Sequence, residues 1–236
     1  MSGAEQLSQY LISGLTTGAV YALVALGFCL IYNTTHIVNF AQGDFLSLGG
    51  LLLYSLLAGA GLALPLAFAL TVLGSALVGA ALERLALRQA RSREVTVLIF
   101  ITVAASVFLR GVFKEVWGKQ ALAVPSFSPE TPLRLLGATF TPQNLWVVGI
   151  TLAAIAGLGW FFNRTLTGKA MRAVAINPRA AALMGIDVER MLLYSFALAG
   201  GLGGVAGMLI TPITTASYTI GRSEEHTSEL QSRSDL

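Results

Sequence analysis

The chain consists of long apolar runs that alternate with short polar connections. Six of these runs approach the roughly 20 apolar residues that a helix needs to cross the hydrocarbon core of a bilayer. The pattern therefore predicts an all-α, polytopic transmembrane helical bundle with about six membrane segments. The predicted segments are Leu7–Tyr32, Ile37–Leu57, Gly61–Leu82, Val95–Phe113, Asn144–Phe162 and Met191–Ile213.

The connections between the runs predict which side of the membrane each one faces. Glu83–Glu94 contains four arginines and Asn163–Arg190 contains five basic residues, whereas Lys114–Gln143 contains four prolines and three basic residues. Because basic residues concentrate in cytoplasmic loops, the first two connections are expected inside and the third outside. The polar start of Ile37–Leu57 leaves two arrangements open. If this run crosses fully, the N-terminus lies outside, and if it is re-entrant, the N-terminus lies inside.

Composition supports a membrane protein and excludes some other classes. Hydrophobic residues make up 55% of the chain and charged residues 11%, well below the roughly 25% charge of soluble domains. The basic balance is the normal expectation for cytoplasmic loops and requires no nucleic-acid partner. The single cysteine, Cys29, excludes an internal disulfide and a thiolate metal site.

The last fifteen residues differ sharply from the rest. Arg222–Leu236 is polar, and its first eleven residues, Arg222–Ser232, resemble the in-frame translation of a common sequencing adapter. We therefore expect a membrane domain over 1–221 and a non-native tail over 222–236, with the natural C-terminus missing. Without the tail, the chain has 13 basic and 8 acidic residues.

A polar stretch between the first two runs is the strongest candidate for a substrate pathway. It includes Asn39, Gln42, Gly43 and Asp44. A carboxylate at the bilayer centre costs at least about 2.5–3.5 kcal/mol, so Asp44 is expected to face protein, water or substrate, or to lie near an interface. The stretch has two compatible interpretations. Asn39 or Asp44 caps the second helix, or the broken helix lines a translocation pathway.

The second candidate is a short cytoplasmic helix. Asn177 and Pro178 mark its start, Arg179, Ala180 and Ala181 follow, and Gly185 is expected to end it as a C-terminal cap. One interpretation is an interfacial helix that lies on lipid. The other is a docking element for a cytoplasmic partner.

Glycines in the last run are spaced for close helix packing. Gly200 and Gly204 are four residues apart, as are Gly203 and Gly207, so each pair lies on one helix face. Small residues allow helix backbones to approach closely in lipid, where hydrophobicity contributes little to association.

Two motifs, in order, resemble one family of proteins. The run from Arg179-Ala180-Ala181 to Gly185 resembles the coupling loop of bacterial ABC importer permeases, with arginine in place of the family's glutamate. Arginine at this position reverses the charge of the family's glutamate. The wider stretch 168–188, together with residues 14–27 and 39–44, is similar to the branched-chain amino acid permeases of LivH type. The resemblance covers about residues 7–220, and it implies roughly two further membrane segments in a full-length member.

The resemblance implies a subunit that works with partners. These are a second related permease, two cytoplasmic ATPase subunits and an extracytoplasmic binding protein, in the bacterial inner membrane. The chain lacks the Gly-x-x-x-x-Gly-Lys-Ser/Thr motif, so we expect no bound cofactor and ATP hydrolysis on the partner subunits. Urea or short amides are alternative substrates, and a stand-alone secondary transporter is an alternative class. An enzyme is not expected, because the chain has no nucleophile–base motif and no His-Glu-x-x-His metal motif.

Overall fold

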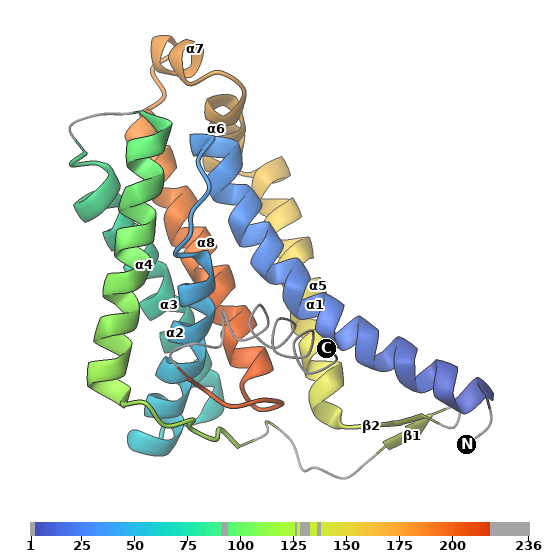
Figure 1. Cartoon of the computed structure of the whole chain (residues 1–236). Helices are drawn as coiled ribbons and strands as arrows, with labels where there is room; N and C mark the ends of the chain where they lie inside the picture. Colours follow the sequence, from blue (N-terminus) through green and yellow to red (C-terminus); the bar gives the residue numbers. More distant parts are fainter. Residues whose placement is uncertain (1–2, 91–93, 126, 128–132, 136–137, 218–236) are drawn as a thin grey trace, which may run out of the picture.

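The computed structural model describes residues 3–90, 94–125, 127, 133–135 and 138–217, and they form the helical bundle of Figure 1. The predicted all-α membrane bundle is confirmed. Within the described residues, five helices, rather than the predicted six segments, are long and apolar enough to cross a membrane. These are α1 (Gly3–Thr35), α3 (Leu64–Leu82, continued by the π-helical turn η2, Glu83–Leu87), α4 (Val95–Trp117), α5 (Pro142–Arg164) and α8 (Val188–Ile210). The shorter elements are α2 (Gln42–Tyr54), the π-helical turn η1 (Ser55–Gly59), α6 (Leu166–Ile176) and α7 (Pro178–Leu183). An antiparallel hairpin of β1 (Leu133–Leu135) and β2 (Ala138–Phe140) adds a strand pair that the sequence did not predict.

The second apolar run is not the continuous helix that was predicted over 37–57. His36 has a φ of +55°, and its N–H donates to the carbonyl of Tyr32 at 2.8 Å. That bond ends α1 with a left-handed residue, a conformation in which histidine is enriched among non-glycine residues. No regular helix forms over 37–41, and α2 begins only at Gln42.

Figure 1 favours one of the two arrangements that the sequence left open. The helix α1 runs from the hairpin end of the bundle to the end that carries α6 and α7. The segment from residue 37 to η1 then returns to the hairpin end, so the second run passes along the bundle from one end to the other as an irregular stretch followed by a helix. The positive-inside rule places α6 and α7 in the cytoplasm, which puts the start of α1 on the outer side.

The helix α8 is the centre of the bundle. In the most apolar 18-residue window of α8, 67% is buried, whereas the corresponding shares in α4 and α5 are 17% and 11%. The helix α8 packs against α1, α2 and α3, and the core between them includes Leu23, Phe45, Leu51, Met208 and Leu209. The outer faces of α4 and α5 are therefore available to lipid or to other proteins.

The predicted outer connection is tied to the end of the bundle. Leu122, which follows α4, and Ala216, which follows α8, exchange two backbone hydrogen bonds of 2.8 Å. The stretch 222–236, interpreted from the sequence as a non-native tail, lies outside the described residues.

Candidate functional site

The break between α1 and α2 buries two amide side chains inside the bundle. Asn39 is 2% exposed, and its Oδ1 accepts a hydrogen bond from the N–H of Ala41 at 3.1 Å. Gln42 is 4% exposed, and its Nε2 donates to the carbonyl of Ala199 on α8 at 3.3 Å. A Cβ at Gly27 of α1 would overlap this same Nε2, so Gln42 is wedged between α1 and α8.

Each of these amides keeps one buried polar atom without a hydrogen bond. Among the described residues, Asn39 Nδ2 and Gln42 Oε1 have no partner. Such atoms are costly in a dry interior and are normally satisfied by water, by a ligand or by a change of conformation. The break in the helix therefore offers one donor and one acceptor at a place where the backbone is already irregular.

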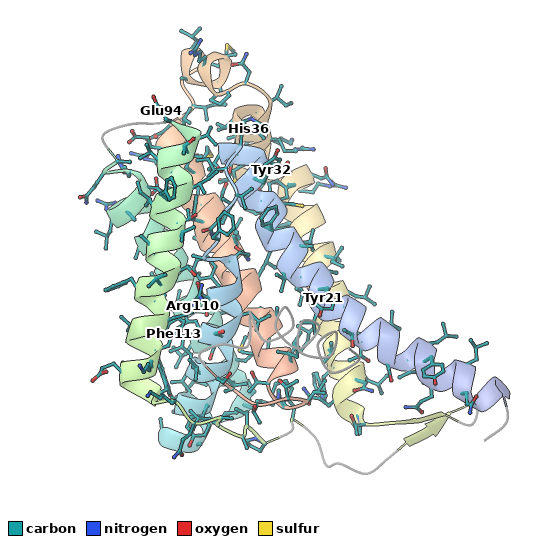
Figure 2. The ribbon with its side chains drawn as sticks, viewed as in Figure 1. Tyr21, Tyr32, His36, Glu94, Arg110 and Phe113 are labelled. Carbon is teal, nitrogen blue, oxygen red and sulfur yellow. The ribbon has the colours of Figure 1, made fainter. Side chains whose placement is uncertain are left out.

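The Asp44 carboxylate faces α4 from the first turn of α2. Its Oδ1 accepts a hydrogen bond from Arg110 Nε at 2.9 Å, and the Asp44 side chain is only 7% exposed. A second nitrogen of the same guanidinium, Nη2, donates to Ser106 Oγ. Figure 2 places Arg110 on α4 at the level of α2.

The N-cap position of α2 carries no side-chain cap. The residue at the N-cap position of α2 is Ala41, which makes no side-chain capping bond. Asn39 instead closes the turn that precedes α2 through its bond to the Ala41 N–H. Gly43 is half-buried within the first turn.

A polar seam joins α4 to the second segment, and sequence reasoning found only part of it. The buried residues of α4 are Thr102, Ser106 and Phe113, so much of the inner face of this membrane helix is polar. Thr102 Oγ1 accepts from the Phe40 N–H at 3.3 Å, beside the break. Near the outer end, Trp117 Nε1 donates to Ser55 Oγ at 2.6 Å.

The signal that could have identified this seam is its spacing. Thr102, Ser106 and Arg110 are four residues apart and therefore share one face of α4. Arg110 is the charged residue within the predicted span Val95–Phe113.

The glycines of α8 lie where two neighbouring helices come closest. A Cβ at Gly200 or Gly204 would overlap Ser75 of α3. A Cβ at Gly203 or Gly207 would instead overlap α2, at Phe45 and at the Leu46 carbonyl. The first pair therefore lies against α3 and the second against α2. Gly204 also meets α2, where a Cβ at Gly49 would overlap the Gly204 backbone.

The cytoplasmic helix α7 has a complete set of local caps. Asn177 Oδ1 accepts from the Ala180 N–H at 3.0 Å, and Pro178 occupies the first turn. At the other end, the N–H of Gly185 donates to Ala182 and the N–H of Ile186 donates to Ala181, at 3.0 and 3.1 Å. This pair of bonds is a Schellman motif, and it requires the left-handed φ of +83° that glycine supplies.

The helix α7 is attached to the bundle on one side and apolar on the other. Ala181 is 4% exposed and packs in a cluster with Met171, Val174 and Met191. Leu183 and Met184, in contrast, are 89% and 83% exposed. Ala180 and Arg179 are also exposed. Figure 1 shows α7 beyond the end of α4.

A cavity of about 210 Å³ lies between α7 and the membrane helices. Its lining includes Pro178 of α7, Thr34 of α1 and Phe196 of α8. At this cavity Arg88 Nη2 and Glu189 Oε2 form an ion pair of 2.5 Å between the end of η2 and the start of α8. The short helix is therefore next to the cytoplasmic ends of three membrane segments.

Comparison with known proteins identifies the family. Residues 10–223 match the family model described as the permease component of branched-chain amino acid transport systems. This chain belongs to that family. The match ends within two residues of the start of the polar stretch 222–236, whose adapter interpretation stays a prediction.

Individual relatives agree with this assignment. The chain is 27% identical over 214 residues to BraD, a high-affinity branched-chain amino acid permease protein of Pseudomonas aeruginosa, which covers 86% of this chain and 70% of BraD. It is 25% identical over 214 residues to the Escherichia coli permease protein LivH, with the same coverage. It is 32% identical over 199 residues to a probable LivH of Methanocaldococcus jannaschii, covering 80% of this chain and 61% of that protein. No solved structure matches the chain. The protein is thus a multi-pass permease of the inner membrane.

Proposed function

We propose that this chain is the membrane-spanning permease subunit of an ATP-driven importer of branched-chain amino acids. The substrate class follows the names of its relatives, which are high-affinity branched-chain amino acid permeases. Its partners are a second related permease, two cytoplasmic ATPase subunits and an extracytoplasmic binding protein. ATP binds to the ATPase subunits, and this chain holds no cofactor.

The observation that carries the coupling proposal is the construction of α7. Its caps and the buried Ala181 hold the helix on the bundle, so that Leu183 and Met184 remain in the open. Exposed large apolar side chains on a rigid element are a common feature of docking sites. We infer that the segment Asn177–Gly185 sits in a cleft of the ATPase.

Movement of the ATPase would then reach the membrane helices through direct neighbours. Pro178 lines the same cavity as Thr34 of α1 and Phe196 of α8, so a shift of α7 acts on the ends of both helices. Those helices flank the break that carries Asn39, Gln42, Gly43 and Asp44, because Gln42 contacts α8 and abuts α1. We propose that this break lines the substrate pathway and that its unsatisfied amide atoms bind water or substrate during transport.

A secondary transporter driven by ions is less well supported. Asp44 and Arg110, which lie within the predicted spans Ile37–Leu57 and Val95–Phe113, pair with each other. An ion-coupled carrier would use such groups to bind and release the coupling ion.

The Leu183→Glu variant tests the docking proposal. We expect uptake by the assembled transporter to fall about tenfold, the effect of roughly 1.4 kcal/mol of lost docking energy. Abundance in the membrane should not change, because Leu183 is 89% exposed and does not hold α7 in place. Radiolabelled leucine uptake and co-purification of the ATPase measure the two effects.

Leu166→Glu is the matched control, since Leu166 is 84% exposed but lies at the far end of α6. It should leave co-purification of the ATPase unchanged. Normal uptake in a Leu183→Glu/Met184→Glu double variant would contradict the docking proposal. Variants of Ala181 or Gly185 are less informative, because they disturb the burial and the left-handed cap that hold α7 itself.

A further inference from the structure

A second site lies on the outside of the bundle, at its cytoplasmic end. A groove of about 450 Å³ runs between α1, α5 and α6. Most of its lining is apolar and includes Leu26, Leu30, Ile155, Leu158, Phe162 and Met171. Neither the break in α1–α2 nor the docking helix α7 contributes to it.

One cationic side chain lies in this lining. Arg172 of α6 borders the groove, and its Nη1 donates to Asn163 Oδ1 at 3.2 Å. Arg164 and Lys169, which are exposed on the same cytoplasmic side, add positive charge close by in the sequence. The groove thus combines an apolar interior with a guanidinium at the level where lipid headgroups lie.

We propose that this groove binds an anionic phospholipid, with an acyl chain between α1 and α5 and the phosphate beside Arg172. The apolar lining suits a hydrocarbon chain and would exclude a zwitterionic amino acid. The guanidinium fork matches a phosphate group better than an ammonium would. The groove borders α5, whose apolar stretch is only 11% buried, so lipid can reach it from the bilayer. This proposal depends on membrane insertion and not on the choice of transported substrate.

The acyl-chain half of the proposal is tested by filling the groove. A Cβ at Gly159, which lines the groove, would meet nothing within 4 Å, so Gly159→Phe can place its ring there without backbone strain. Gly157 on the same helix is equally open but does not line the groove, and Gly157→Phe is the matched control. The probe is phosphatidylglycerol with a photoreactive diazirine in its acyl chain, reconstituted with the full protein and its native partners.

The expected result is cross-linking of this probe to α1 and α5 peptides that border the groove. Gly159→Phe should reduce that cross-linking about tenfold, which corresponds to roughly 1.4 kcal/mol of binding energy, and Gly157→Phe should not. Equal cross-linking in both variants would overturn the proposal. Cys29 also lines the groove. Absence of lipid adducts together with cross-linking of a partner protein to Cys29 would also overturn the proposal.

The headgroup half is tested by charge. Wild-type protein should cross-link the phosphatidylglycerol probe more strongly than the phosphatidylcholine probe with the same acyl chain. Arg172→Gln should abolish that preference while retaining the chain adducts. Arg84→Gln, an exposed arginine on η2 that does not line the groove, should retain the preference. Equal labelling of the wild-type protein by both probes would indicate contact with bulk bilayer lipid only. That result would overturn the proposal of a specific phospholipid site.

Discussion

Replacing Gly207 with alanine is expected to remove most of the folded permease from the membrane. A Cβ at this position would overlap the Leu46 carbonyl oxygen and approach the Gly50 nitrogen, which are backbone atoms of α2. Backbone cannot rotate away as a flexible side chain can, so α2 and α8 would have to separate. The substitution should lower the free energy of unfolding by at least about 1–3 kcal/mol, the usual effect of overpacking a tight interior. Membrane abundance and the thermal stability of the solubilised protein measure it.

The control is Gly111→Ala on α4. Gly111 also lies within a membrane helix, but a Cβ there would meet nothing within 4 Å. Alanine should therefore be neutral or should stabilise the helix by up to about 1 kcal/mol through its higher propensity. If the two alanine variants are equally stable, the α2–α8 contact is not the tight packing inferred here.

The sequence predicted the parts of this fold that depend on local properties. The five long membrane helices follow from the length of the apolar runs. The caps of α7 follow from Asn177, Pro178 and Gly185 in their immediate surroundings. The spacing of Gly200, Gly204 and their neighbours indicated two packing faces. It did not indicate that one faces α3 and the other α2, since that depends on tertiary contacts.

The break before α2 was less predictable because it depends on residues far away in the chain. The polar stretch was evident, but the helix start at Gln42 also involves α8 and α4. Ala199 accepts a bond from Gln42, and Thr102 accepts one from the Phe40 N–H. A single sequence does not pair positions that lie 62 and 157 residues apart. For the same reason, the capping interpretation of Asp44 did not anticipate its partner on α4.

Replacing Arg110 with methionine is expected to destabilise the permease strongly. Asp44, with a side chain only 7% exposed, would lose its guanidinium partner. Removing one member of a buried ion pair costs about 3–5 kcal/mol, and the lower end applies because the Arg110 side chain is 26% exposed. Lys114→Met is the control, since Lys114 lies one turn away on α4 and is exposed. Similar melting temperatures for the two variants would contradict a stabilising role for the pair.

The double variant Asp44→Asn/Arg110→Met separates stability from transport. Removing both charges leaves no uncompensated ion, so the double variant should recover most of the stability lost by Arg110→Met. If the break at Asn39–Asp44 lines the pathway, this stable double variant should still transport poorly. The reason is that the side chain introduced by Asp44→Asn lacks the negative charge that Asp44 places next to Gln42 and Gly43. Thermal stability and substrate uptake, measured on the same preparation of the assembled transporter, distinguish the two roles. If thermal stability and uptake both recover fully, the Asp44–Arg110 ion pair serves only to hold α2 against α4.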